Sequence, residues 1–160
     1  GEMIQLSEFY NKGPVILVFY RGGWCAFCNR YLRELQEHLN EFKEYGASII
    51  AVSVEEPLKQ AETARDLNLG FELVSTGGKN ILEKYNVVHT LADVFVEQYR
   101  EVHDVDLKKV SKRDDYAIAA PATYIIDQNG RIVYAYANKN YKVRTSAKVL
   151  LEELKSLHAQ

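Results

Sequence analysis

Cysteine, proline and long apolar runs are scarce in this chain of 160 residues, which has two cysteines and three prolines. Two cysteines cannot build a disulfide scaffold, so a buried core must stabilise the fold, and the length is sufficient for one. The apolar run at residues 14–20, PVILVFY, has the length of a β-strand and falls far short of the roughly 20 residues that span a bilayer. The sequence therefore predicts a folded chain without a membrane partner.

An excess of one charge is also missing, since 20 Lys and Arg face 22 Asp and Glu for a net charge of −2. Such a balance gives no electrostatic reason to bind nucleic acid or an anionic membrane. The sequence has no repeat, low-complexity segment or linker rich in proline and glycine, so residues 1–160 are expected to form one domain. The first residues, Gly-Glu-Met, are compatible with a removed N-terminal signal, and the expected compartment is the cytoplasm.

The hydrophobic pattern predicts an α/β fold. Residues 14–20 and 48–54 are continuous apolar runs of the kind that buried strands show, and residues 71–75 indicate a third strand. Between residues 28 and 45 the apolar residues recur at steps of three and four, which predicts a helix that ends at Gly46. Pro57 is typical of the first turn of a helix, here expected to reach residue 67.

The second half of the chain predicts helices, a hairpin and a last helix. NILEKYNV and LADVFVEQYREV are expected to be helical, and residues 108–115 to form a solvated loop within an insertion. After Pro121, two β-rich runs flank Asn129-Gly130, a pair that favours a tight hairpin turn. Ser146 is expected to cap the last helix. Strand–helix–strand units make parallel neighbours and the hairpin adds antiparallel ones, so we expect a central mixed sheet with helices on both faces.

The two cysteines lie three positions apart in GGWCAFCNRYL, where a strand leads through a short loop into a helix. A helix N-terminus presents free N–H groups and a partial positive charge, which lower the pKa of a cysteine thiol and stabilise the thiolate. Arg21 and Arg30 would add positive potential unless they point to water. Cys28 belongs to the inward stripe and is expected to be buried, whereas Cys25 is expected near the surface. Local physics thus predicts Cys25 as the attacking thiolate and Cys28 as the thiol that closes the disulfide.

A metal site, a structural disulfide and coincidental burial are less favoured for this cysteine pair. A structural zinc site needs about four ligands, and none of the four histidines pairs closely with another in the sequence, so no metal is expected. A structural disulfide across so short a loop would restrict the unfolded chain only slightly. Two core cysteines that lie close by coincidence are the third alternative. His89 and His103 are candidate bases by residue type alone, and surface roles are favoured for both.

The segment FYRGGWCAFCN resembles the signature of peroxiredoxin-like proteins of the alkyl hydroperoxide reductase/thiol-specific antioxidant (AhpC/TSA) family. The resemblance continues through AVSVEEP, FELVSTGGKNILEKYNV, APATYIIDQNGRI and NKNYKVR, and it spans nearly the whole chain from about Leu6. It implies a thioredoxin-like fold. It also implies an oxidoreductase that carries a redox-active Cys25–Cys28 disulfide and no bound cofactor.

Part of the motif is similar to that of thioredoxin-like disulfide reductases, which have Trp-Cys-x-x-Cys facing a cis-proline. Trp24, Cys25 and Cys28 match the cysteine motif, and Pro121 matches the proline, so this resemblance implies a cis bond before Pro121. The alternative is a trans proline that starts a strand. Thr123 follows two positions later, where a free backbone edge would pair with an extended peptide substrate. The simpler alternative for its side chain is packing within the strand. Trp24 is expected to shield the site or form a docking surface.

The peroxiredoxin pattern, Pro-x-x-x-Thr-x-x-Cys, matches less completely. It puts Cys28 at the position that attacks peroxide, Cys25 in place of the threonine and Arg21 in place of the proline. Pro121 also stands where a peroxidase has an arginine beside its cysteine. Three elements are therefore replaced, which argues against high peroxidase activity. Arg21 or Arg144 would supply the missing charge, although arginines at such positions are more often on the surface.

Two mechanisms follow, and both end with an oxidised Cys25–Cys28 pair. A thiolate attacks a hydroperoxide and becomes a sulfenic acid that condenses with its neighbour, or Cys25 attacks a substrate disulfide and Cys28 releases it. Either cycle needs a thioredoxin-like protein or a small thiol as electron donor. Hydroperoxide reduction is the preferred hypothesis, disulfide reduction the second, and a redox sensor without turnover the third. Tyr20 is expected to line the pocket, and a homodimer is compatible with the sequence.

Overall fold

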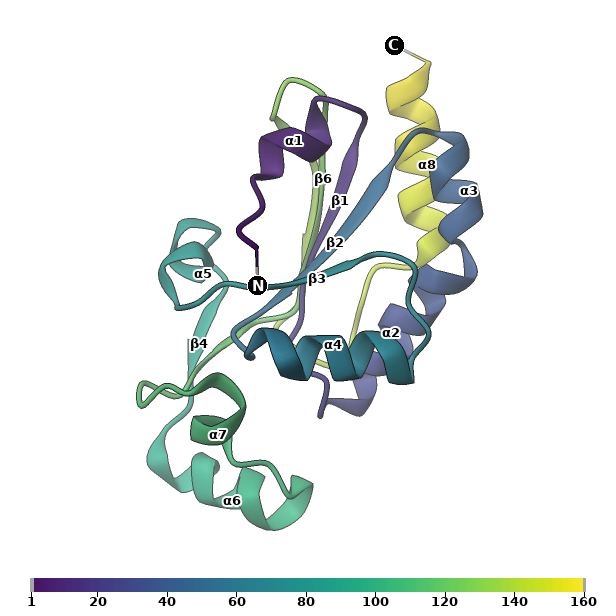
Figure 1. Ribbon diagram of the computed structural model, residues 1–160. Coiled ribbons are helices and arrows are strands. Elements are labelled where there is room, and N and C mark those ends of the chain that lie inside the picture. The colour runs from purple at the N-terminus through teal and green to yellow at the C-terminus, as the bar shows by residue number, and fades with distance from the viewer. Residues whose placement is uncertain (1, 160) are drawn as a thin grey trace.

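The computed structural model describes residues 2–159, which form a five-stranded mixed sheet between two layers of helices (Figure 1). The strand order is β3-β2-β1-β6-β7, in which β2 pairs in parallel with β1 and β3, whereas β6 is antiparallel to β1 and β7. The expected α/β architecture with a mixed sheet is confirmed. The strands are β1 (Val15–Phe19), β2 (Ser48–Ser53), β3 (Glu72–Ser75), β6 (Ala122–Ile126) and β7 (Ile132–Ala137).

One face of the sheet carries α2, α3 and α8, and the other faces α1, α5 and the insertion. Figure 1 shows α3 and α8 side by side on one side of the sheet, with α1 and α5 on the other. On the first face, Ile16 and Val18 of β1 pack in one core with Leu32, Phe42 and Leu150. The helices are α1 (Leu6–Tyr10), α2 (Ala26–Glu37), α3 (Leu39–Glu44), α4 (Pro57–Asp66), α5 (Asn80–Lys84) and α8 (Ala147–His158).

The insertion, residues 88–119 between α5 and β6, forms secondary structure of its own. It contains a two-stranded antiparallel sheet of β4 (Val88–Thr90) and β5 (Ala117–Ala119), with α6 (Asp93–His103) and α7 (Leu107–Ser111) between them. In Figure 1 it extends from the lower left of the main sheet. The two short strands are too brief to show a pattern in the sequence. The insertion places α6 near the end of β1 from which the cysteine loop leaves.

Several boundaries differ from the expected ones. The helix expected over residues 28–45 is two helices, because the backbone at His38 leaves helical geometry before α3 begins. Residues 108–115 are not entirely loop, since α7 covers their first part. This short helix forms because the Asp106 carboxylate accepts the N–H groups of Lys108 and Lys109, at 3.1 and 3.3 Å.

Three turn and cap predictions are confirmed. Gly46 ends α3 with a φ of +68°, a left-handed conformation that a residue without a Cβ adopts easily. Gly130 has a φ of +76° in the β6–β7 connection. The Ser146 hydroxyl accepts the N–H of Val149 and caps α8. No helix within the described residues is long and apolar enough to cross a membrane.

Candidate active site

The loop between β1 and α2 holds both cysteines at the first turn of the helix. Cys25 is the N-cap residue of α2, with φ −90° and ψ 111°, and Cys28 lies in the first turn. This placement arises because the buried strand ends at Phe19 and the loop turns back through a hydrogen bond from Cys25 N–H to the Gly22 carbonyl, at 3.1 Å. Both side chains are free thiols. The sequence prediction of two cysteines at one helix N-terminus is confirmed.

Both sulfurs belong to residues that are almost completely buried. Cys28 is 1% exposed, as expected from its place on the inward stripe of α2. Cys25 is only 4% exposed, so its expected position near the surface is wrong. The reason is that Arg21 folds over it, with Nη1 at 3.8 Å from Cys25 Sγ, and Trp24 packs against the same core. A reactant must therefore be small or must displace part of this cover.

The two thiols have opposite pKa shifts. Hydrogen bonding from the Cys28 thiol lowers the pKa of Cys25 to about 6, with further lowering by the Cys28 backbone amide, Arg21 and Arg144, while burial opposes them. The pKa of Cys28 is raised, because its thiol donates a hydrogen bond to the Cys25 sulfur and therefore keeps its proton, and because it is buried. Cys25 is then the group that holds the negative charge at neutral pH, which is the form that attacks.

Arg21 is held in a cage of three aromatic rings. Its guanidinium carbon lies 4.2 Å from the ring centre of Tyr141, 5.0 Å from that of Trp24 and 5.3 Å from that of Tyr99. Flat guanidinium groups stack well on such rings. Tyr141 thereby covers the arginine that touches Cys25. Tyr99 comes from α6, so the insertion takes part in the site.

Arg144 approaches the other sulfur. Its Nη2 lies 3.4 Å from Cys28 Sγ, and its Nη1 donates to the Tyr141 and Val143 carbonyls. The surface position favoured for Arg21 is wrong, because Arg21 is buried, whereas Arg144 is half-buried at the surface; each guanidinium faces a thiol. Arg30, the other arginine near the motif, is exposed on α2. The positive charge that Pro121 replaces in the peroxiredoxin pattern is thus available from two other arginines.

Pro121 and Thr123 differ from the roles that the thioredoxin resemblance implies. No cis peptide bond occurs within residues 2–159, so the expected cis-proline is wrong and Pro121 directly precedes β6 in the trans form. Thr123 pairs with Val18 on one side and Tyr136 on the other, so its backbone offers no free edge to a peptide. Its hydroxyl is 3.1 Å from the Tyr31 hydroxyl, which anchors α2 to the sheet.

Tyr20 and Trp24 carry buried polar atoms without partners. The Tyr20 hydroxyl and Trp24 Nε1 have no hydrogen-bond partner within the described part of the chain. Burial raises the pKa of Tyr20, which packs in the core that contains both cysteines and does not line the pocket beside Arg21. Tyr20 is therefore a core residue rather than the expected pocket residue. Trp24 does cover the site, stacked on Arg21.

Sequence reasoning missed Glu55, a buried carboxyl that holds the cysteine loop. Glu55 Oε2 accepts the Gly23 N–H at 2.9 Å and the Ser53 hydroxyl at 3.4 Å. Burial raises the pKa of this carboxyl, and the charge of Cys25 adds to the rise. The sequence signal that could have found it is its position two residues after the end of β2, because the parallel strands β1 and β2 end at the same edge of the sheet.

Replacing Glu55 with glutamine should change how stability depends on pH. The pKa of the Glu55 carboxyl is higher in the folded than in the unfolded protein. The neutral acid therefore adds to the free energy of unfolding at pH values below the unfolded-state pKa, and this contribution is lost as the pH rises through the folded-state pKa. Glutamine stays neutral and keeps an acceptor for Gly23. We expect Glu55→Gln to be more stable than the wild type at pH 7.5 by on the order of 1 kcal/mol, with a smaller difference at pH 4.5, in urea unfolding.

The matched control for this prediction is Glu56→Gln. Glu56 is the next residue, and its carboxylate is more exposed and pairs with Lys112 Nζ at 2.8 Å. The control should show no such gain at pH 7.5. A Glu55→Gln protein that is less stable than the wild type at pH 7.5 would mean that the loop needs the negative charge itself.

His89 and His103 are the remaining candidates for a catalytic base. Within residues 2–159, no cluster of three or more histidine, cysteine or acidic side chains is arranged to hold a metal ion. His103 lies beside Trp24, with ring centres 6.4 Å apart, and His89 and His103 both line a pocket that Arg21 also lines. Neither histidine contacts a cysteine.

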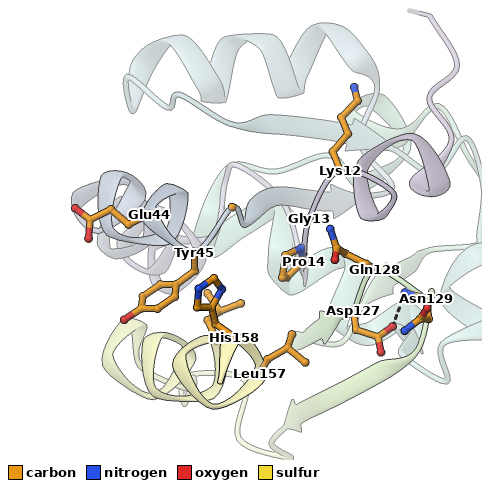
Figure 2. A pocket seen from close by; sticks show the side chains of 12 residues that line it. Lys12, Gly13, Pro14, Glu44, Tyr45, Asp127, Gln128, Asn129, Leu157 and His158 are labelled. Carbon is orange, nitrogen blue, oxygen red and sulfur yellow. Dashed lines mark hydrogen bonds between the residues drawn. The ribbon is translucent and has the colours of Figure 1, made fainter. Parts of the chain in front are cut away.

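A separate pocket of about 540 Å³ lies at the opposite end of the sheet (Figure 2). Lys12, Gly13 and Pro14 line it just before β1, whereas the cysteine loop follows β1, so a strand of about 16 Å lies between them. Figure 2 shows the Asp127 carboxylate, which accepts a hydrogen bond from the Asn129 backbone N–H, and the His158 ring beside Tyr45. This pocket is too far from the thiols to contribute to their chemistry.

Comparison with known proteins finds relatives that are named as thiol-disulfide oxidoreductases or peroxiredoxins. A family model described as the AhpC/TSA family matches residues 1–135. Thiol-disulfide oxidoreductase ResA of Halalkalibacterium halodurans is 31% identical over 103 residues, which is 64% of this chain and 57% of that protein. Chloroplastic peroxiredoxin Q of Gentiana triflora is 24% identical over 139 residues, which is 87% of this chain and 53% of that protein. The chain therefore spans little more than half the length of these curated relatives.

Solved structures confirm the thioredoxin-like fold that was expected. The crystal structure of peroxidoxin BcpB from Mycobacterium tuberculosis superposes with a TM-score of 0.73 at 19% identity, covering 95% of this chain and 84% of that one. At this identity the likeness concerns the fold, while the family rests on the match over residues 1–135. Together with the paired thiols at the start of α2, these findings show that the chain belongs to the AhpC/TSA family.

Proposed function

We propose that this chain is a peroxiredoxin-like thiol oxidoreductase that reduces hydroperoxides through Cys25 and Cys28. The observation that carries the proposal is the position of the Cys25 sulfur at the N-cap of α2, 3.8 Å from the buried Arg21 guanidinium, where its pKa is lowered to about 6. Its near-complete burial favours a small reactant over a folded protein disulfide.

The reaction begins at the Cys25 thiolate. Its sulfur attacks the terminal oxygen of the hydroperoxide, the O–O bond breaks, and the electron pair leaves with the alkoxide or hydroxide, which takes up a proton. Cys25 becomes a sulfenic acid. The Cys28 sulfur then attacks the Cys25 sulfur, a disulfide forms, and water leaves. Arg21 and Arg144 stabilise the negative charges that develop on sulfur and oxygen in these steps.

The cycle closes when an external dithiol, or two small thiols, reduces the Cys25–Cys28 disulfide by thiol–disulfide exchange. A thioredoxin-like protein is the donor that the sequence predicted, and no bound cofactor enters any step. The cytoplasmic location and the homodimer stay predictions of the sequence.

Disulfide reduction is the second candidate function. It is favoured by the Trp-Cys-x-x-Cys motif and by the match to a relative named as a thiol-disulfide oxidoreductase. In this reaction the Cys25 thiolate attacks one sulfur of the substrate disulfide, and Cys28 then displaces the substrate thiol. A sensor that changes redox state without turnover is the third hypothesis.

A coupled assay tests the proposal. The chain is mixed with thioredoxin, thioredoxin reductase and NADPH, and NADPH consumption is followed with hydrogen peroxide, with an alkyl hydroperoxide or with insulin. We expect peroxide-dependent consumption that exceeds the rate with insulin. The control is the Cys25→Ser/Cys28→Ser double variant, which should consume no more NADPH than the mixture without the chain.

Each other outcome rejects the proposal in favour of a stated alternative. Turnover with insulin alone indicates a disulfide reductase. Oxidation of the cysteines by peroxide without NADPH-dependent turnover, repeated with glutathione or dithiothreitol as donor, indicates a sensor.

A further inference from the structure

A pocket of about 650 Å³ lies between the insertion and the cysteine loop. Its walls come from α6, the β4–β5 pair, Pro121 and residues 138–141, and Arg21 is the one lining residue from the loop that carries the cysteines. Neither cysteine lines it, and Arg21 is the lining residue that contacts a thiol, the thiol of Cys25. Its volume falls within the range of roughly 300–1,000 Å³ that is usual for small-molecule sites.

The pocket wall that α6 provides is mainly apolar, with Phe95, Tyr99 and Val102 beside the polar Gln98 and His103, and it is open to water. The residues of α6 that line it recur at helical spacing, so one stripe of the helix faces the pocket. On this stripe Phe95 is 51% exposed and Val102 is 65% exposed, and Tyr141 across the pocket is also exposed. Several large apolar side chains exposed around one hollow mark a binding surface. A molecule that binds in this pocket would therefore bury an apolar part against α6.

The charged groups of the pocket are of one sign. Arg21 and Lys139 line it, and no aspartate or glutamate occurs among its lining residues, all of which belong to the described part of the chain. The chain as a whole is slightly acidic, with a net charge of −2. This local cationic character is complementary to an anion.

Arg21 supplies the most specific signal. It is 7% exposed, and within residues 2–159 it forms no salt bridge, its one side-chain hydrogen-bond acceptor being the Cys25 sulfur. A guanidinium has five donors, and buried cations are normally paired with an acid or fully hydrogen-bonded. A buried arginine with donors to spare at the wall of a pocket fits a carboxylate that binds from the pocket side.

The geometry points to this pocket as a binding site for an amphipathic carboxylate, whose chain packs on Phe95 and Val102 and whose carboxylate pairs with Arg21. The inference goes beyond the proposed function, because binding requires neither cysteine to react. It has a consequence for the thiols, since a carboxylate on Arg21 competes with the Cys25 thiolate for the same guanidinium. An occupied pocket therefore lowers the thiolate fraction of Cys25 at a given pH.

A fluorescence titration tests the site. Trp24 is the single tryptophan of the chain and stacks on Arg21, so its emission reports on a ligand at that guanidinium. We expect decanoate to give a saturable change. Decanol lacks the charge and should bind at least about tenfold more weakly, as loss of one charge-assisted contact implies. Acetate lacks the apolar chain and should also bind at least about tenfold more weakly, because it buries almost no apolar surface. The thiolate absorbance of the wild type at pH 7 should fall as decanoate is added.

Two substitutions on α6 make the test specific. Val102→Gln adds a polar amide to the apolar wall and should weaken decanoate binding several-fold. Val94→Gln makes the same chemical change on the same helix at a residue that is 71% exposed and outside the pocket lining, and should leave binding unchanged. Because both residues are exposed, neither substitution should prevent folding.

The proposal is overturned if decanoate gives no saturable change, or if decanol binds as well as decanoate. It is also overturned if Val94→Gln weakens binding as much as Val102→Gln, which would place the ligand elsewhere. Binding of decanoate with an unchanged thiolate absorbance would reject the pairing with Arg21. None of these outcomes depends on turnover, so they are distinct from a failure of the proposed peroxidase function.

Discussion

Replacing Cys25 with serine is expected to reduce the rate of the first reaction with peroxide by at least about 1,000-fold, as loss of a catalytic nucleophile does. The serine hydroxyl has the same shape as the thiol, is slightly smaller and is not ionised at neutral pH, so the charged attacking group disappears. The Cys28 thiol that remains is buried and has a raised pKa, so it is a poor substitute. Stopped-flow mixing with hydrogen peroxide, followed by Trp24 fluorescence, measures this rate.

Cys28→Ser is the matched variant and should behave differently. Cys25 keeps its helix terminus, its arginines and a hydroxyl donor in place of the Cys28 thiol, so the first oxidation should proceed at a rate within about tenfold of the wild type. The reaction should then stop at a Cys25 sulfenic acid, visible by mass spectrometry as one added oxygen or one dimedone adduct. If Cys25→Ser instead reacts normally and Cys28→Ser does not, Cys28 is the attacker, as the peroxiredoxin alignment implies.

The second large effect is expected for Arg21→Gln. The hydrogen bonds from Cys28 are the main causes that lower the pKa of Cys25 to about 6, and the charge of Arg21 adds to them; removing an opposite charge at this distance raises a pKa by about 1 unit. Below the pKa of both proteins the thiolate fraction should fall about tenfold for each unit, whereas well above both values the two proteins should react alike. The pH profile of peroxide oxidation and the thiolate absorbance both measure the shift.

Two controls separate charge from packing in this experiment. Arg21→Lys keeps the positive charge but loses the planar group that stacks in the aromatic cage, so its pKa for Cys25 should lie between those of the wild type and Arg21→Gln. Arg30→Gln removes an exposed arginine of α2 and should leave the profile unchanged. A profile of Arg21→Gln that coincides with the wild type would show that Arg21 does not act on the thiolate.

The helix-terminal position of the cysteines could be predicted from the sequence because it depends on local patterns. The apolar run that ends at residue 20 and the helical spacing from Cys28 onward place the motif at a strand–helix junction without any distant contact. The same local logic predicted that Cys28 is buried. It also predicted the cap at Ser146 and the turn at Gly130, each of which depends on a few neighbouring residues.

The errors concern features that depend on segments far apart in the chain. Cys25 is buried because its neighbour Arg21 is held by Tyr99 and Tyr141, which lie about 80 and 120 positions away along the sequence. Thr123 has no free edge because β7 pairs beside it. Glu55 was overlooked because its partner, the Gly23 amide, lies on a different strand–helix loop.

The sequence by itself determined that this chain is a mixed α/β protein with two cysteines at the positive end of one helix, because hydrophobic period and capping are properties of neighbouring residues. The tertiary structure alone decided that Cys25 is buried, which arginines face the thiols, and that a cationic pocket meets Arg21 from the insertion side. Those features depend on the burial of charges and on contacts between distant segments, and both come into being only when the sheet, α2 and α6 pack together.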